Sequence, residues 1–286
     1  MAAVTAFIKR SPVLTYFALT FAISWGLILI VVGPGGFPVT AEQLEILLPF
    51  AIVAMLAGPS VAGILLTGLV SGRAGFRDLW SRMLKWRVDI RWYAVALLIA
   101  PLLTSSVLLA LSLRSPEFLP AIVNADDIAS VLLLGLTAGL LVGIFEELGW
   151  TGFATPRLRL QYGVLATGVI VGLLWGLWHF LLFWEGDTFL SALPLAILLG
   201  RLFSWTPAYR ALMVWVYDRT ESLPVAILMH ASLTATQFIL VPLDVSGAAL
   251  LTYILLWAAA LWIVVAAVTV VSGGQLSRQP IPGRMA

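Results

Sequence analysis

The sequence predicts an all-α protein, a bundle of about eight membrane-spanning helices with one additional amphipathic helix in the membrane interface. Composition gives the first reason. Of the 286 residues, 61% are hydrophobic and only 10% are charged, whereas an ordinary globular protein has about 25% charged residues. The second reason is that the apolar residues form long runs, and the mean hydropathy is +1.04. The polar residues are too few to cover a water-facing globule of this size, so we expect a lipid bilayer around the chain.

Eight runs approach the roughly 20 apolar residues that a helix needs to cross the hydrocarbon core. They are Val13–Val32, Leu48–Val70, Trp92–Leu113, Ile128–Phe145, Val164–Phe183, Phe189–Val216, Leu223–Val241 and Ala248–Val271. Arg201, Pro207 and Arg210 interrupt the sixth run, which predicts a broken helix or a span with an interfacial extension. We expect one integral-membrane domain over residues 1–271 and a disordered cytoplasmic tail over residues 272–286, which are rich in Gly, Pro, Ser and Arg.

The charges of the connecting segments predict the orientation of the bundle. Basic and acidic connections alternate along the chain: Arg77 and Arg82 lie in the second loop, for example, and Asp126 and Asp127 in the third. Since cytoplasmic loops have an excess of Lys and Arg, the alternation places both termini in the cytoplasm.

The segment Arg73–Tyr93 mixes apolar residues at helical spacing with six basic residues. This pattern is typical of a helix that lies in the headgroup plane and is attracted to anionic lipid. A substrate-docking surface is the alternative.

Two further properties limit the possible functions. The chain has no cysteine, which excludes disulfides, a cysteine-based zinc ribbon and a thiol nucleophile. The formal net charge is only +2, and no cluster of basic and aromatic residues on one face suggests a nucleic-acid partner. The expected partners are the lipid bilayer and a membrane-associated substrate.

Two glutamates and two histidines lie in or at the edge of apolar runs. They are Glu146 and Glu147, at the end of the fourth run, and the two histidines of the chain, His179 and His230. An isolated charge inside a bilayer costs at least about 2.5–3.5 kcal/mol on insertion scales, so such residues are candidates for function. Taken separately, each has a simpler explanation, a solvated helix end for the glutamates and a bridge between helices for a histidine. Together they predict one shared polar site.

Helical spacing assigns different neighbours to the two carboxylates. Glu146 shares a helix face with Trp150, four residues on, whereas Glu147 points about 100° away and shares its face with Thr151. The two glutamates therefore need not have the same role.

The histidines follow the same spacing. Trp175 lies one turn before His179, and Thr234 lies one turn after His230. We interpret Trp175 as a packing or supporting residue rather than as a substrate contact.

Two kinds of hydrolytic site are consistent with these residues. In one, a desolvated glutamate is the general base that activates a water, and a histidine stabilises the oxyanion. In the other, Glu146, His179 and His230 bind zinc, which lowers the pKa of a bound water. No H-E-x-x-H motif is present, so a metal site would have to be assembled from three helices.

Three segments of the chain resemble the signatures of the CPBP family, the CAAX-protease and bacteriocin-processing (Abi) intramembrane endopeptidases. They are Glu146–Glu147 followed by Gly152 and Phe153, Trp175 with His179, and Pro224 with His230 and Ala231, all within residues 73–240. The resemblance implies cleavage of a membrane-associated or prenylated peptide. It also implies that Glu146 is the general base, that Glu147 supports it, and that His179 and His230 position the water and stabilise the developing charge.

Two positions depart from the family pattern. Thr151 stands where the pattern Glu-Glu-x-x-x-Arg has its arginine, and Thr234 stands where His-x-x-x-Asn has its asparagine. Thr151 lacks the cation that keeps a neighbouring glutamate ionised, although Arg157 would be close enough if the helix broke near Pro156. The hydroxyl of Thr234 can still donate one hydrogen bond.

These departures leave alternatives open. One is a non-catalytic scaffold or a bacteriocin-immunity protein that keeps the fold, and another is a proton-coupled transporter. The intact Glu146, His179 and His230 favour the peptidase.

Overall fold

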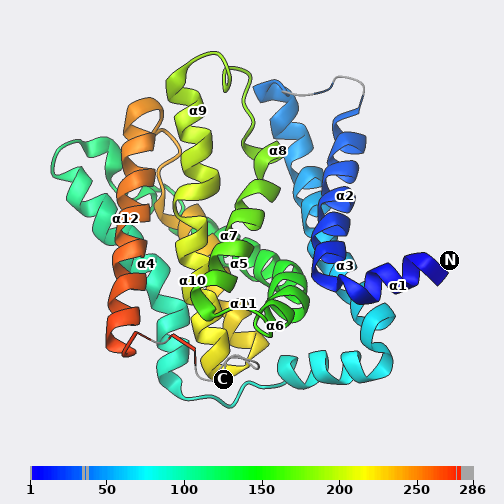
Figure 1. The fold of residues 1–286 in the computed structure, drawn as a ribbon. Helices are drawn as coiled ribbons and strands as arrows, with labels where there is room; N and C mark the ends of the chain where they lie inside the picture. Colours follow the sequence, from blue (N-terminus) through cyan, green and yellow to red (C-terminus); the bar gives the residue numbers. More distant parts are fainter. Residues whose placement is uncertain (1, 34–35, 37–38, 275, 278–286) are drawn as a thin grey trace.

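The computed structural model describes residues 2–33, 36, 39–274 and 276–277, and in this part of the chain it contains helices and no strands (Figure 1). The predicted all-α fold is therefore confirmed. The α-helices are α1 (Ala2–Arg10), α2 (Pro12–Val32), α3 (Ala41–Met83), α4 (Ile90–Ser112), α5 (Ile128–Gly149), α6 (Thr155–Leu158), α7 (Val164–Trp178), α8 (Phe180–Phe183), α9 (Ala192–Leu199), α10 (Thr206–Thr220), α11 (Leu223–Leu240) and α12 (Gly247–Val271). Two short 3₁₀ helices, η2 (Pro116–Phe118) and η3 (Ala121–Asn124), lie between α4 and α5.

Six of the described helices are long and apolar enough to cross a membrane. They are Pro12–Val32, Ile46–Met83, Ile90–Ser112, Ile128–Leu158, Leu223–Leu240 and Gly247–Val271. The fifth predicted span corresponds to α7, which has 15 residues, followed by the short α8. The sixth is broken into α9, a π-helical turn η5 (Gly200–Ser204) and α10, so the broken-helix alternative is the correct one.

Helix α3 contains the first part of the predicted interfacial segment, up to Met83; the rest is a non-helical connection and the start of α4 at Ile90. Gly72 has a non-helical backbone with φ of 56° and ψ of −143°, and the helix changes direction there (Figure 1). A positive φ is readily adopted only by glycine. The last turns of α3 expose Trp80 and bury Leu79, which packs against Leu223 and Ile227 of α11. The amphipathic pattern therefore has one face on the bundle and the other outside it.

Glycines allow α5 and α11 to pack closely. Gly135, Gly139 and Gly143 recur every fourth residue on one face of α5, and α11 covers this face. A Cβ atom at Gly143 would lie 2.7 Å from the backbone oxygen of Ile227, closer than side chains are normally found, so any larger residue would separate the helices. Glu147 is the next residue in the same four-residue series and therefore faces α11 as well.

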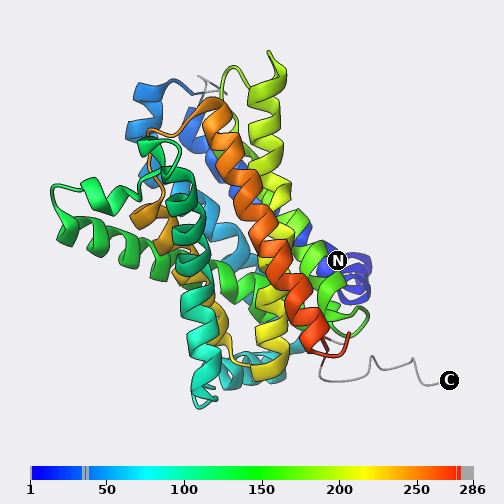
Figure 2. The ribbon, with the colours of Figure 1, turned by 90° about the vertical axis from the view of Figure 1, so that its left-hand side faces the viewer.

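A second glycine series joins α7 to α10. Gly168, Gly172 and Gly176 lie on one face of α7, and a Cβ atom at Gly172 would lie 2.8 Å from the backbone oxygen of Thr206 in α10. Figure 1 shows α7, α10 and α11 in the middle of the molecule, and in Figure 2 α5 runs from one edge of the molecule toward them. The two close contacts bring the polar residues of these helices together.

The start of the predicted tail packs on the bundle. Leu276 is buried, and its carbonyl oxygen accepts a hydrogen bond from Arg219 of α10. Residues 278–286 lie outside the described residues, so their predicted disorder stays a prediction.

Candidate functional site

The helix that contains the two glutamates continues past them. Helix α5 extends to Gly149 and is followed without interruption by the π-helical turn η4 (Trp150–Ala154) and by α6. The predicted end of this span at Phe145 is therefore wrong. Glu146 is 2% exposed and Glu147 is fully buried, which contradicts the alternative of a solvated helix-end pair. Buried carboxylates must be compensated by hydrogen bonds and opposite charge, and the structure supplies both.

Two indole groups hold the Glu146 carboxylate. Its Oε2 atom accepts a hydrogen bond of 3.0 Å from Nε1 of Trp150 and one of 2.7 Å from Nε1 of Trp175. The same oxygen lies 3.9 Å from Nη2 of Arg210 and 4.0 Å from Nε2 of His230. A gap of 4.0 Å is too long for a direct hydrogen bond, but it is short enough for a single water to contact both atoms.

Glu147 has more partners than Glu146. Its Oε1 atom is 2.7 Å from Nη1 of Arg210 and 2.6 Å from Nδ1 of His230, and its Oε2 atom accepts a hydrogen bond from the Thr151 hydroxyl. The predicted pairing of Glu146 with Trp150 and of Glu147 with Thr151 is confirmed. Both oxygens of Glu147 are thus occupied by donors, whereas Glu146 faces His230 across a gap.

Hydrogen bonds at Nδ1 orient both imidazole rings. His230 donates its Nδ1–H to Glu147, and His179 donates its Nδ1–H to the backbone oxygen of Trp175 at 2.8 Å, because neither oxygen can act as a donor. In each ring the other nitrogen, Nε2, is left for further contacts, and Nε2 of His230 faces Oε2 of Glu146 at 4.0 Å. The ring centroid of Trp175 lies 5.2 Å from that of His179 and 5.4 Å from that of His230, both in edge-on geometry. Trp175 thus contacts both histidines as well as Glu146.

Arg210 of α10 is the site residue that the sequence analysis missed. It was treated only as an interruption of an apolar run, yet its side chain is 1% exposed and forms the ion pair with Glu147. Its guanidinium carbon also lies 4.4 Å from the ring centroid of Trp175, a cation–π contact. The available signal was the cost of placing a lone arginine in an apolar helix, the same argument that selected the histidines.

The structure shows which residues lie near the two positions that depart from the family pattern. Arg157 does not reach the glutamates; its guanidinium donates to the backbone oxygen of Phe153 and to the Ser71 hydroxyl. The helix does not break at Pro156, and Arg210 provides the cation instead. Thr234 is half-buried on α11, one turn after His230.

The metal alternative requires three ligands from this cluster. Among the described residues, no group of three His, Cys, Asp or Glu side chains is placed to hold a metal ion. The positive charge of Arg210 beside Glu146 would also repel a second cation. In this arrangement the described residues of the cluster do not fit a zinc ion.

Comparison with known proteins gives a consistent result. A family model described as type II CAAX prenyl endopeptidase Rce1-like matches residues 128–236. CAAX prenyl protease 2 of Methanococcus maripaludis is 29% identical over 145 residues, which are 43% of this chain and 52% of that protein. The resemblance to the CPBP family is confirmed. The aligned part spans about half the length of the curated relative.

Residues 128–236, which we call the CPBP segment, contain the whole polar cluster. Glu146, Glu147, His179, Arg210 and His230 all lie inside it. Together with the six apolar helices, the CPBP resemblance indicates an integral, multi-pass membrane protein.

Proposed function

We propose that the protein is an intramembrane endopeptidase that hydrolyses a peptide bond in a membrane-associated substrate. The observation that carries this proposal is the 4.0 Å gap between Oε2 of Glu146 and Nε2 of His230, inside a buried cluster contributed by α5, α7, α10 and α11. A water held between these atoms would contact a carboxylate that can take its proton and an imidazole that fixes its position.

In this proposal, Glu146 is the general base. It accepts a proton from the water as the water oxygen attacks the carbonyl carbon of the scissile bond. The tetrahedral intermediate collapses when the C–N bond breaks, and Glu146 returns the proton to the leaving amine. The indole donors of Trp150 and Trp175 fix the carboxylate without transferring a proton, because an indole N–H remains protonated throughout.

Glu147 is a positioning residue rather than the base. Both of its oxygens accept hydrogen bonds, and its contact with His230 fixes the ring so that Nε2 faces Glu146. This arrangement resembles other active sites in which a buried carboxylate orients a histidine.

The two histidines are the candidate hydrogen-bond donors to the oxyanion. A protonated Nε2 is a hydrogen-bond donor and would stabilise the oxyanion that forms on the substrate carbonyl. Thr234 and Thr151 remain supporting residues in this proposal.

The proposed substrate class follows the name of the relative. CAAX prenyl protease 2 is named for prenylated proteins, so we propose that the substrate is a prenylated peptide whose lipid chain enters the bilayer beside the CPBP segment. We further propose that both termini are cytoplasmic, because the charge alternation places the basic connections on that side.

The test uses the purified full chain in proteoliposomes with a farnesylated fluorogenic CAAX peptide and the same peptide without the lipid. Glu146→Gln keeps the shape of the side chain and removes the base, and we expect it to lower kcat by about 10²–10⁴-fold. The matched control is Glu42→Gln at an exposed position of α3, which should keep wild-type kcat.

Full turnover by Glu146→Gln would refute the peptidase mechanism. The non-catalytic alternative predicts instead that neither peptide is cleaved by the wild type and that a cellular phenotype survives this substitution. Elemental analysis of the same preparation tests the zinc alternative, since one retained zinc per chain, lost together with activity on chelation, would favour it.

A further inference from the structure

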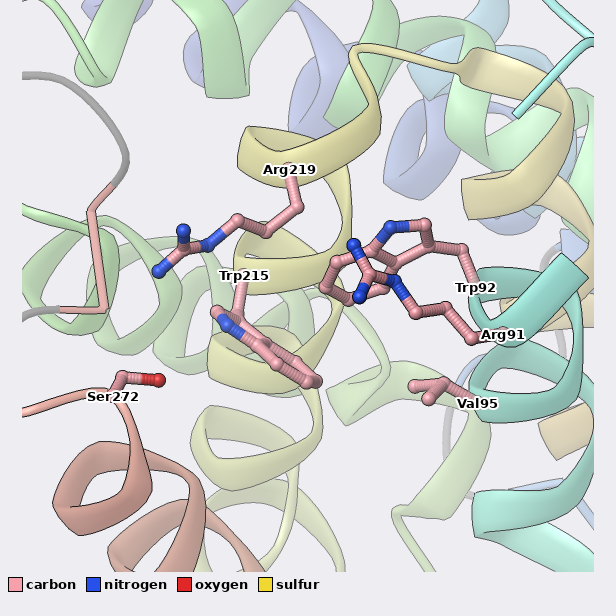
Figure 3. A pocket seen from close by; sticks show the side chains of 6 residues that line it. All are labelled: Arg91, Trp92, Val95, Trp215, Arg219 and Ser272. Atoms are coloured by element: carbon pink, nitrogen blue, oxygen red, sulfur yellow. The ribbon is translucent and has the colours of Figure 1, made fainter. Parts of the chain in front are cut away.

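A pocket lined by two arginines and by apolar side chains lies away from the catalytic cluster, where three helices end. It has a volume of about 530 Å³ and is lined by Arg91, Trp92, Val95, Trp215, Arg219 and Ser272 (Figure 3). This volume falls within the roughly 300–1,000 Å³ typical of small-ligand sites. None of the lining residues belongs to the cluster around Glu146.

The pocket lies at the end of two predicted membrane spans, near the expected membrane surface. Arg91 is the second residue of α4, and Ser272 directly follows the last residue of α12, and both helices are long and apolar enough to be spans. The pocket is therefore at the level where these spans leave the hydrocarbon core. Lipid phosphates lie at this level, and tryptophans are enriched there. Trp92 and Trp215 form one wall, with ring centroids 5.0 Å apart in edge-on contact.

The donors that line the pocket suit a phosphate group. Guanidinium groups bind phosphate through paired hydrogen bonds, and Arg91 and Arg219 approach the pocket from different helices. Figure 3 shows Arg91 beside Trp92, and Arg219 extending toward the side of Ser272. The Nε1 atom of Trp215 is a buried donor with no hydrogen-bond partner among the described residues, and it lies on the side of its ring toward Arg219 and Ser272 (Figure 3).

The residues that line the pocket include two arginines and no acidic residue. Asp89 lies 3.3 Å from Nε of Arg91, but both side chains are largely exposed, with 52% and 71% of their surfaces accessible, so this ion pair is weak. Arg219 donates a hydrogen bond to the backbone oxygen of Leu276, and Asp218, next to it in the chain, pairs with Arg159 at 2.6 Å.

We propose that this Arg91–Arg219 pocket binds the phosphate group of an anionic membrane lipid. The two arginines contact the phosphate oxygens, Nε1 of Trp215 and the Ser272 hydroxyl add donors, and the acyl chains continue along the apolar surfaces of α4 and α12. Such a lipid would contact the ends of α4, α10 and α12 and stabilise their packing against one another. This binding is independent of the proposed peptidase activity.

The experiment measures lipid retention by the purified, delipidated full chain with native mass spectrometry. The probes are phosphatidylglycerol, phosphatidylcholine and inorganic phosphate. We expect phosphatidylglycerol to bind more tightly than phosphatidylcholine, and the double variant Arg91→Gln/Arg219→Gln to weaken its binding by at least about tenfold, since each arginine contributes charge-assisted hydrogen bonds. Arg91→Gln alone, at an exposed position, should give a smaller loss and serves if the double variant does not fold.

The matched control is Arg73→Gln/Arg77→Gln, which removes the same charge from exposed positions of α3 outside the pocket. Unchanged phosphatidylglycerol binding in the pocket variants would overturn the proposal, as would an equal loss in the α3 control. Displacement of the lipid by an equal concentration of inorganic phosphate would overturn the lipid as the source of the phosphate.

Discussion

Replacing Arg210 tests whether its cation takes the place of the arginine that the CPBP pattern puts at position 151. The ion pair with Glu147 joins atoms 2.7 Å apart in side chains that are 1% and 0% exposed. At an effective dielectric constant of about 20, two unit charges at 2.7 Å attract each other by about 6 kcal/mol. Desolvation offsets part of this attraction, and removing one partner of such a buried pair typically costs about 3–5 kcal/mol of stability.

We therefore expect Arg210→Met to lower the free energy of unfolding by about 3–5 kcal/mol and to abolish turnover. Glu147 would be left as an uncompensated buried charge and would no longer orient His230. Arg210→Lys keeps the charge without the planar fork. It should retain most of the stability but lose about tenfold in kcat with little change in KM, assuming one charge-assisted hydrogen bond to be lost.

The most direct test moves the charge from α10 to position 151 in η4, the turn that follows α5. The hydroxyl of Thr151 already contacts Glu147, so an arginine at this position, one helical turn away, is close enough to pair with it. Thr151→Arg in the Arg210→Met background should restore part of both stability and kcat. The assays are denaturant unfolding in mild detergent and cleavage of the farnesylated peptide. Wild-type turnover by Arg210→Met, or no gain from Thr151→Arg when the double variant folds, would refute the reasoning.

Three further predictions concern packing, the hydrogen bonds of the base, and topology. Gly143→Ala places a Cβ atom 2.7 Å from a backbone oxygen of α11 and should lower the free energy of unfolding by about 1–3 kcal/mol in the same assay. Gly26→Ala, where a Cβ atom would meet nothing within 4 Å, should not lower it. Equal stabilities of the two variants would contradict the packing argument. Trp175→Phe removes the indole N–H that donates to Glu146 at 2.7 Å and should reduce kcat by about 10–100-fold. Trp178→Phe removes a buried indole nitrogen without a partner among the described residues and should leave kcat nearly unchanged. Equal kcat values in the two variants would contradict the role of the Trp175 hydrogen bond. In this cysteine-free chain, Asp126→Cys should react with an impermeant maleimide on intact cells, and labelling only after permeabilisation would reverse the predicted orientation.

The sequence by itself determined the fold class and most of the polar site. Apolar runs specify membrane helices because backbone polar groups in lipid must be satisfied within the helix. The pairs Glu146–Trp150 and Glu147–Thr151 were equally predictable, since residues four apart always meet on a helix. The selection of Glu146, Glu147, His179 and His230 as one cluster followed from the cost of isolated charges in a bilayer.

Only the tertiary structure decided how the helices pack and which polar side chains come into contact. The glycine series of α5 and α7 set how closely α11 and α10 approach, and this packing brings His230 to Glu147 and Arg210 to both glutamates. Contacts between residues 63 positions apart, such as Glu147 and Arg210, depend on helix packing that no local pattern encodes. For the same reason, the sequence could not show that the cation missing from position 151 in η4 is provided by Arg210 of α10.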